Sequence, residues 1–380
     1  MIKKKNFFIN SKIHKPNIEK TKNIFNLFKK DFENKTIPFL KSYTKEYKFE
    51  FSTATVKKYS RYKNIIIFGM GGSILGTKSI YSFLKKKIKK EVFFFDNLDS
   101  NLHIKYKKIK NLKNSCFIVV SKSGNTLETI TNLENIFPKS LLKNKLVIIT
   151  ELNSSSLINI GSKFNAEIIE HKKFIGGRYS VLSETGMFPA ALMNLNINKF
   201  KNLKTLIKNK YFTNSLINSV SSIYTLNQRG INNSVMLNYD SQLNDLCLWY
   251  QQLTGESLGK KGQGITPIVS TCPKDHHRLL QLYLDGPRDK FFTFFSSAGE
   301  KSEKFKSLIY AQCEATKNIF KKKQIPFRHF ILKKKNENEL GSVFIFFILE
   351  TLLLARLMNV NPYNQPAVEE VKKETKKFLR

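Results

Sequence analysis

The sequence predicts an α/β fold with parallel sheets in two domains, and three observations support this prediction. Short runs of β-branched and aromatic residues alternate with longer segments at helical spacing, as in layered α/β proteins. Most of the short runs are apolar throughout, which is typical of parallel strands buried on both faces. The chain has 380 residues, of which 41% are hydrophobic, so it can form two sizeable cores.

The predicted strands fall into two groups along the chain. They are Ile65–Phe68, Val92–Phe95, Phe117–Val120, Lys145–Ile149, Ser234–Leu237, Phe291–Phe295 and Phe330–Leu332. Helices are expected between them, for example over Thr126–Ile136 and Ser241–Leu253. We therefore expect a helical lead-in over 1–40, a first domain over 41–195, a second domain over 196–360 and a short tail over 361–380.

The net charge of +36 comes from 65 Lys and Arg against 29 Asp and Glu. Only eight of the basic residues are arginines, on which specific nucleic-acid readers rely. The lysines are spread along a chain that is also rich in Asn, Ile and Phe, so drift toward A/T-rich codons explains the charge. We expect no nucleic-acid partner, and salt-sensitive, sequence-independent DNA binding is the competing hypothesis.

Cysteine usage and hydropathy indicate a cytoplasmic protein without a membrane partner. The four cysteines form no CxxC pair, so neither a disulfide framework nor a structural zinc site is expected. The basic N-terminus lacks the continuous apolar segment of a signal peptide. The most apolar stretch, Val343–Met358, contains Glu350 and Arg356 and is expected to be a buried helix.

Glycines follow the first predicted strand in the segment IIIFGMGGSILG at residues 65–76. Glycines between a strand and a helix let the backbone approach an anion at the helix N-terminus. Ile74 stands where a dinucleotide fingerprint needs its third glycine, although Asp96 ends the next strand and keeps that possibility open. A P-loop is rejected, because Thr77 displaces Lys78 by one position from the place of the P-loop lysine. The alternative is a turn that serves only strand–helix packing.

Two further segments carry groups suited to an anion. SKSGNT at 121–126 follows a buried strand and precedes a helix, so its hydroxyls, N–H groups and lysine suit a phosphate monoester. The alternative is a helix capped by Ser or Thr. GGRYSVLSETG at 176–186 presents Arg178, which could bind phosphate or stabilise an enediolate, unless it is an ordinary solvated arginine.

Six segments occur in the order found in glucose-6-phosphate isomerases. They are GMGGSILG, SKSGNTLET, GGRYSVLS, LTGESLGKKG, DHHRLLQLYLDG and NPYNQPAVEEVK, and they cover roughly residues 65–372. The chain resembles a short, bacterial-type member of this family. The resemblance implies two sugar-isomerase (SIS) domains, each an α-β-α sandwich, and a helical tail.

The resemblance also implies an activity and a partner. Members interconvert glucose 6-phosphate and fructose 6-phosphate, in glycolysis and gluconeogenesis, through ring opening and a cis-enediol. They use no metal or cofactor and are usually homodimers with sites shared between subunits. A bifunctional glucose/mannose phosphate isomerase is the nearest alternative, and activity on mannose 6-phosphate would separate the two. A non-catalytic SIS sugar-phosphate sensor is less favoured, because it has no reason to keep the catalytic residues named next.

The resemblance assigns catalytic roles to four side chains. Glu256, in a motif like ESxGK, would move a proton between C1 and C2 of the sugar. His277 would assist ring opening from the neighbouring subunit, and the adjacent His276 is the alternative. Lys372 would act as a cation near O5 or O1, and Arg178 would stabilise the enediolate.

The remaining assignments from the resemblance concern substrate binding. They are Gly72 and Ser73 beside the sugar, and Ser121, Lys122, Ser123, Thr126 and Gln365 around the phosphate. The chain departs from the family pattern at Asn125, Leu258 and Val371, and its C-terminal arm is shorter than in most members. These departures remove no reactive group, and they bear on substrate breadth and dimer contacts.

Overall fold

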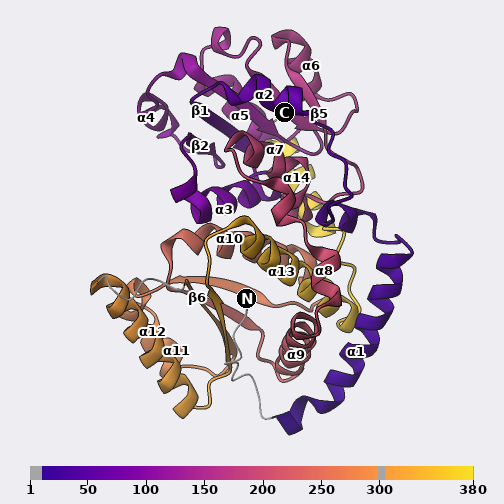
Figure 1. The fold of residues 1–380 in the computed structure, drawn as a ribbon, viewed down its shortest axis with the longest axis vertical. Coiled ribbons are helices and arrows are strands. Elements are labelled where there is room, and N and C mark those ends of the chain that lie inside the picture. Colours follow the sequence, from indigo (N-terminus) through magenta and orange to yellow (C-terminus); the bar gives the residue numbers. More distant parts are fainter. Residues whose placement is uncertain (1–10, 298–303, 380) are drawn as a thin grey trace.

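The computed structural model describes residues 11–297 and 304–379, which form two α/β units (Figure 1). The unit at the top of Figure 1 contains a five-stranded sheet, and the unit below it contains a four-stranded sheet. Every strand pair in both sheets is parallel. The predicted fold class is therefore confirmed.

The first sheet has the order β2-β1-β3-β4-β5. Its strands are β1 (Asn64–Gly69), β2 (Glu91–Phe95), β3 (Ser115–Val120), β4 (Leu146–Thr150) and β5 (Glu167–Glu170). β1, β3 and β4 are buried along their whole length, which explains their continuous apolar sequences. The chain leaves β1 toward one edge and returns to the other side at β3. Ligands of open α/β sheets bind at such a switch point, outside the carboxyl ends of the strands.

The second sheet has the order β7-β6-β8-β9. Its strands are β6 (Asn233–Asn238), β7 (Thr266–Thr271), β8 (Lys290–Ser297) and β9 (Phe327–Leu332). All seven predicted strands are present, and the structure adds β5 and β7, which the sequence did not indicate. Both are edge strands: β5 has a glutamate at each end, and β7 contains Pro267 and is only partly buried. Neither has the continuous apolar sequence that marks the inner strands.

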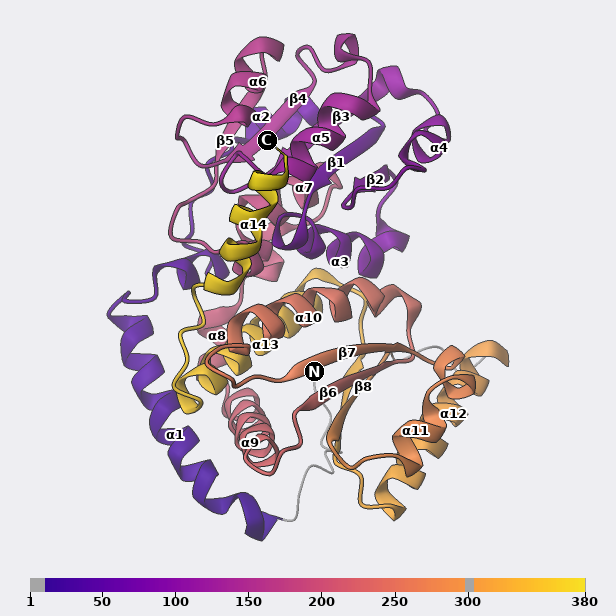
Figure 2. The ribbon, with the colours of Figure 1, turned by 180° about the vertical axis from the view of Figure 1, so that it is seen from behind.

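Helices cover both faces of each sheet (Figures 1 and 2). Those of the first unit are α2 (Thr53–Ser60), α3 (Leu75–Leu84), α4 (Leu102–Lys107), α5 (Leu127–Ile136), α6 (Ser156–Phe164) and α7 (Glu184–Leu192). Those that follow are α8 (Leu203–Lys208), α9 (Lys210–Asn227), α10 (Asn244–Leu258), α11 (Leu280–Asp285), α12 (Lys304–Lys322) and α13 (Glu337–Leu357). The helices α1 (Ser11–Glu33) and α14 (Pro366–Phe378) flank the two units. The two helices expected from spacing correspond to α5 and α10.

The long apolar helix α13 is the core of the second unit. It is long and apolar enough to cross a membrane, but 94% of its most apolar 18-residue window is buried inside the protein. The buried helix expected over Val343–Met358 is confirmed. Glu350 within it forms a buried ion pair with Arg328 of β9, and Ser219 also donates to Glu350, at 2.8 Å. A paired and hydrogen-bonded carboxylate is tolerated in a core.

The two units pack together through α3 and α10 (Figure 2). Ser79 Oγ of α3 donates to the backbone oxygen of Asp245 at 2.8 Å. The lead-in helix α1 lies against α9 and α13 of the second unit, where Arg356 pairs with Asp31 at 2.6 Å. It therefore packs on the unit that is more distant in sequence. The domain boundaries predicted at 40, 195 and 360 stay predictions.

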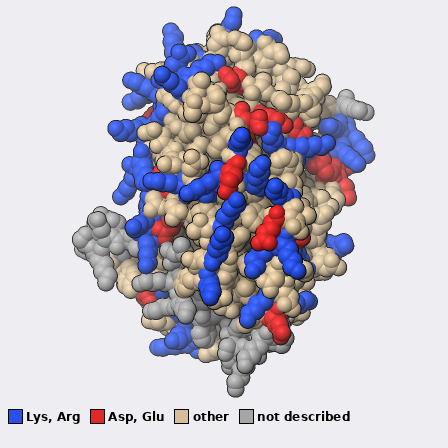
Figure 3. Space-filling model, turned by 45° about the vertical axis from the view of Figure 1, so that its right-hand side comes forward, with Lys and Arg blue, Asp and Glu red and all other residues tan. Residues whose placement is uncertain are grey.

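Basic side chains are scattered over the surface. Figure 3 shows Lys and Arg on one face, interleaved with Asp and Glu. Several lysines of the described chain form ion pairs near the surface, such as Lys58 with Glu167 at 3.0 Å and Lys204 with Glu46 at 2.8 Å. Exposed pairs of this kind contribute little to stability, but they interrupt the positive charge of the surface.

One lysine is buried in an aromatic environment near the start of the second unit. Lys201 is 1% exposed, and its Nζ lies 3.6 Å from the centre of the Phe49 ring and 4.5 Å from that of Tyr47. Its Nζ has no hydrogen-bond acceptor within the described residues. Burial lowers the pKa of Lys201 to about 7, and the nearby Glu184 carboxylate opposes this change.

We predict that Lys201 makes stability rise with pH above neutrality. Between pH 7 and the usual lysine pKa, the unfolded chain binds more protons than the folded chain at this side chain. The free energy of unfolding of the wild type should therefore increase relative to Lys201→Met, by at most about 1.4 kcal/mol per pH unit. Urea unfolding of both proteins at pH 7, 8 and 9 measures this difference. Parallel pH dependences of the two proteins would contradict the prediction.

Candidate functional site

The candidate site lies at the carboxyl ends of β1 and β3, the switch point of the first sheet. Three further segments meet there: the turn Gly177–Leu182, the last turn of α10, and the residues that lead into α14. Figure 2 shows α14 crossing from the second unit onto the first above this region. The site is thus assembled from both units.

Two glycines after β1 allow close backbone contacts. A Cβ atom on Gly72 would lie 2.3 Å from the carbonyl carbon of Gly177. Gly71 has a positive φ of 52°, and a Cβ there would lie 2.8 Å from Gln252 Nε2. These glycines therefore bring the turn that carries Arg178, and the helix that carries Gln252, against the end of β1. Ser73 follows them and is partly exposed.

The guanidinium of Arg178 joins these segments. Arg178 is 3% exposed, so the alternative of a solvated surface arginine is wrong. Its Nη1 donates to Glu256 Oε2 at 2.9 Å and to Gln365 Oε1 at 2.6 Å. The other donors reach Ser257 Oγ at 2.9 Å, Asn364 O at 3.2 Å and Pro362 O. The predicted residues Arg178, Glu256 and Gln365 are thus brought together.

The carboxylate of Glu256 is held from two sides. Arg178 binds Oε2, and Gln252 Nε2 donates to Oε1 at 2.8 Å from one helical turn earlier. The Glu256 side chain is 28% exposed, and each carboxylate oxygen can accept a further hydrogen bond. Glu256 is therefore oriented but still accessible to a substrate.

Gln252 and Lys260 also belong to the site, although neither was predicted from the sequence. Gln252 Oε1 is buried and has no partner among the residues described, so it can accept a hydrogen bond from a ligand. Lys260 Nζ donates to the backbone oxygens of Glu256 and Ser257, at 2.6 and 3.0 Å, and so closes the end of α10. Burial, with the nearby charge of Arg178, lowers the pKa of Lys260 to about 8. The available signals were the four-residue helical spacing of Gln252 and Glu256, and the place of Lys260 in the ESxGK-like motif.

The predicted phosphate loop follows β3 and leads into α5. Ser121 Oγ and Thr126 Oγ1 are 2.7 Å apart, and Gly124 makes the turn with a φ of +68°. Thr126 occupies the N-cap position of α5, but its side chain makes no capping hydrogen bond. The alternative of a Thr-capped helix is therefore wrong. The first backbone N–H groups of α5 remain able to bind an anion, as helix N-termini do.

The two other predicted residues of this loop differ in environment. Lys122 Nζ donates to the backbone oxygen of Lys173 at 2.7 Å and lies 3.7 Å from Glu151. Burial lowers the pKa of Lys122. Ser123 is exposed. A cavity of about 300 Å³ adjoins the loop, and Lys122 and Tyr179 are among the residues that line it.

The structure does not bring His277 to Glu256 within one chain. His277 is exposed in the turn after β7, whereas Glu256 lies at the end of α10, near where β7 begins. A six-residue strand such as β7 spans about 20 Å. His276 is partly buried, and its Nε2 lies 2.7 Å from Tyr239 Oη. The adjacent histidines thus have different environments, and His277 is the one facing solvent.

Lys372 is also outside the cluster of Arg178, Glu256 and Gln365. It is exposed on α14 and pairs with Glu369 at 2.7 Å. It lies seven residues after Gln365, which corresponds to about 10 Å along a helix. Its catalytic role stays a prediction.

Comparisons with known proteins agree on one family. Residues 35–271 match the family model of phosphoglucose isomerase. The glucose-6-phosphate isomerase of Methanocaldococcus jannaschii is 34% identical over 342 residues, which cover 83% of this chain and 84% of that protein.

Two solved structures share the fold. A hypothetical protein from Thermus thermophilus superposes with a TM-score of 0.79 and 21% identity, over 96% of this chain and 95% of that one. A glucose-6-phosphate isomerase from Chlamydia trachomatis superposes with a TM-score of 0.71 and 17% identity, over 85% of this chain and 70% of that one. These likenesses support the expected pair of α-β-α sandwiches.

We predict that Gly72→Ala destabilises the protein and displaces Arg178, because its Cβ would overlap the backbone of Gly177. The free energy of unfolding in urea should fall by about 1–3 kcal/mol. Gly177→Ala is the matched control, because its Cβ would have Gly72 Cα as its nearest neighbour, at 4.0 Å. The control should change stability by less than about 0.5 kcal/mol. Equal effects of the two substitutions would contradict the close contact.

Proposed function

The chain belongs to the phosphoglucose isomerase family, and we propose that it interconverts glucose 6-phosphate and fructose 6-phosphate with Glu256 as the general base. The observation that carries this proposal is the accessible Glu256 carboxylate, oriented by Arg178 and Gln252 beside a loop suited to phosphate. An aldose–ketose isomerisation needs one carboxylate that can both accept and return a proton.

The proton transfer uses the free lone pairs of Glu256. In the open-chain aldose, the carboxylate removes the proton from C2, and the bonding electrons form the C1–C2 double bond while O1 gains the negative charge. A proton then passes from O2 to O1. Glu256 returns its proton to C1, and O2 becomes the ketone oxygen of fructose 6-phosphate. The reverse direction uses the same groups.

The other groups of the site would bind and stabilise the sugar phosphate. The phosphate would lie at the N-terminus of α5, between the Ser121–Thr126 loop and Gln365, with Gly72 and Ser73 beside the sugar. Arg178 forms an ion pair with the Glu256 carboxylate at 2.9 Å and would stabilise the enediolate. Its five donors already have acceptors, so it also fixes the position of the base.

We also propose that the active protein is a homodimer in which His277 of one chain completes the site of the other. The exposure of His277 and its separation from Glu256 along β7 support this arrangement. The helix α14 has no buried residues and presents Val368, Val371 and Phe378 to solvent. An apolar surface of this kind is typical of an interface. Lys372 would act from the same helix.

We also propose that the protein is cytoplasmic. All four cysteines are free thiols and are buried. Reduced thiols without disulfides are typical of proteins from reducing compartments.

We predict that Glu256→Gln lowers kcat by about 10²–10⁴-fold, because the amide keeps the size of the side chain but cannot accept the C2 proton. The conversion of fructose 6-phosphate to glucose 6-phosphate, coupled to a dehydrogenase, measures kcat. In D₂O the variant should also lose deuterium incorporation at C2. Glu167→Gln, on the edge strand β5, is the matched control and should retain full activity. Activity of Glu256→Gln near the wild-type value would exclude Glu256 as the base.

A mixing experiment tests the shared site. Glu256→Gln and His277→Ala homodimers should each be almost inactive. In the mixed dimer, one site combines Glu256 of one chain with His277 of the other, so mixing after mild dissociation should restore activity. The control is Glu256→Gln taken alone through the same dissociation and reassembly, which should restore no activity. No recovery despite confirmed mixed dimers would show that each site uses one chain only.

A further inference from the structure

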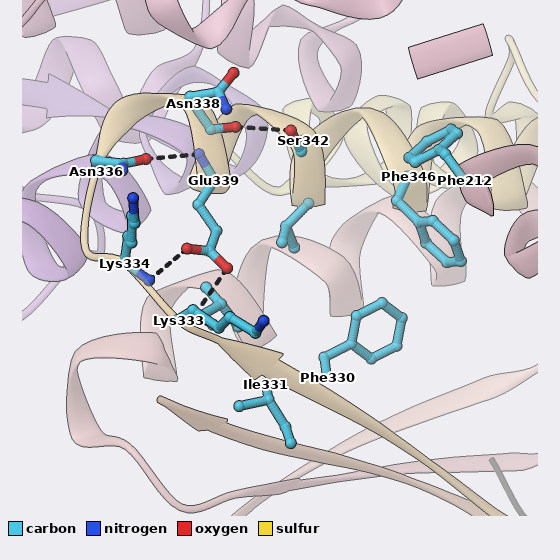
Figure 4. A pocket seen from close by; sticks show the side chains of 12 residues that line it. Phe212, Phe330, Ile331, Lys333, Lys334, Asn336, Asn338, Glu339, Ser342 and Phe346 are labelled. Atoms are coloured by element: carbon cyan, nitrogen blue, oxygen red, sulfur yellow. Dashed lines mark hydrogen bonds between the residues drawn. The ribbon is translucent and has the colours of Figure 1, made fainter. Parts of the chain in front are cut away.

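A second pocket lies in the second unit, where β9 ends and α13 begins (Figure 4). It has a volume of about 200 Å³. The catalytic residues contact the chain just beyond the other end of α13, through Pro362 and Gln365. Because a helix of 21 residues is about 30 Å long, the pocket is separate from the candidate site.

The inner wall of the pocket is apolar. Phe212, Phe330 and Phe346 are each 2% exposed, and Val343 is 7% exposed. Figure 4 shows the Phe212, Phe330 and Phe346 side chains grouped on one side of the pocket. An apolar cavity of about 150 Å³ is large enough to hold benzene and stays dry when empty. This pocket can therefore hold a group of about the size of one phenyl ring.

The mouth of the pocket is polar and carries an excess of positive charge. Lys333 and Lys334 are exposed there, and neither forms an ion pair with any carboxylate in the described ranges. Among the described residues that line the mouth, the one carboxylate is Glu339, which accepts a hydrogen bond from the backbone N–H of Lys333 at 2.8 Å and another from that of Lys334. Glu339 thus holds the loop closed, and two amides partly offset its charge.

The two lysines point in different directions. Figure 4 shows the Lys333 side chain extending from the end of β9 toward Phe330, whereas Lys334 extends toward Asn336. Lys333 therefore places its ammonium group where the apolar wall meets the open mouth. A ligand seated against the phenylalanines would have its polar end at this ammonium group.

We propose that this pocket binds a small monocarboxylate whose apolar body is about the size of one phenyl ring, with the carboxylate held by Lys333. The apolar wall excludes sugars and phosphates as occupants, because their hydroxyl groups would lose hydrogen bonds there. The charge at the mouth favours an anion over a neutral or cationic compound of the same shape. The proposal does not depend on the isomerase activity.

Titration of the full chain with three probes of the same shape tests the proposal. Phenylacetate is the anion, phenylacetamide the neutral isostere and 2-phenylethylamine the cation, and ligand-observed NMR measures each dissociation constant. Phenylacetate should bind most tightly, with an advantage of about two- to fivefold over phenylacetamide, as expected for one exposed charge pair. Saturating glucose 6-phosphate should leave the affinity for phenylacetate unchanged, because the pocket is separate from the catalytic site.

Three variants locate the binding. Lys333→Gln should reduce the affinity for phenylacetate to that for phenylacetamide and leave the amide unaffected. Lys322→Gln, at the exposed end of α12, is the matched control and should change neither. Val343→Phe should abolish binding of both by filling the pocket. The proposal is overturned if the wild type binds none of the probes, binds all three equally or binds the amine most tightly. It is also overturned if glucose 6-phosphate abolishes binding, or if Lys333→Gln has the same affinity for phenylacetate as the wild type.

Discussion

The buried guanidinium of Arg178 is the interaction on which the site depends. Its five N–H donors reach acceptors in α10 and in the chain before α14, so one side chain from the first unit holds two segments of the second. A buried charge is tolerated only when it is paired and hydrogen-bonded. Glu256 supplies the countercharge. The proposed base therefore also stabilises Arg178, the side chain that orients it.

The sequence predicted the strands that contain runs of apolar and aromatic residues, including the edge strands β2 and β9. The inner strands are buried on both faces, and each shows a continuous apolar sequence. β5 and β7 lie at sheet edges and lack that pattern. The loops after β1 and β3 were identifiable because glycines and hydroxyls at strand ends serve ligands in open sheets. Gln252 resembled an ordinary polar residue of a helix, and Lys260 stood in the ESxGK-like motif without an assigned role; only the fold shows that they contact Glu256 and the end of α10.

Within one chain, neither His277 nor Lys372 joins the cluster of Arg178 and Glu256, so their predicted roles do not follow from this structure alone. Both are exposed, and Lys372 pairs with Glu369 and not with a group of the cluster. The apolar side chains of α14 have no cover within the described chain. The proposed second subunit would both complete the site and cover this helix. The charge of +36, by contrast, is a surface property, since lysines on the face in Figure 3 are interleaved with acidic side chains.

The central claim is that Arg178 orients Glu256 for proton transfer, and kcat of Arg178→Lys tests it most directly. Lysine keeps the positive charge but has three donors and no planar fork, so it cannot reach all the acceptors of Arg178 at once. Loss of one or two hydrogen bonds to a charged group corresponds to roughly 10–100-fold in rate. We predict a decrease in kcat of at least about tenfold. A kcat close to that of the wild type would show that charge alone suffices and would contradict the account.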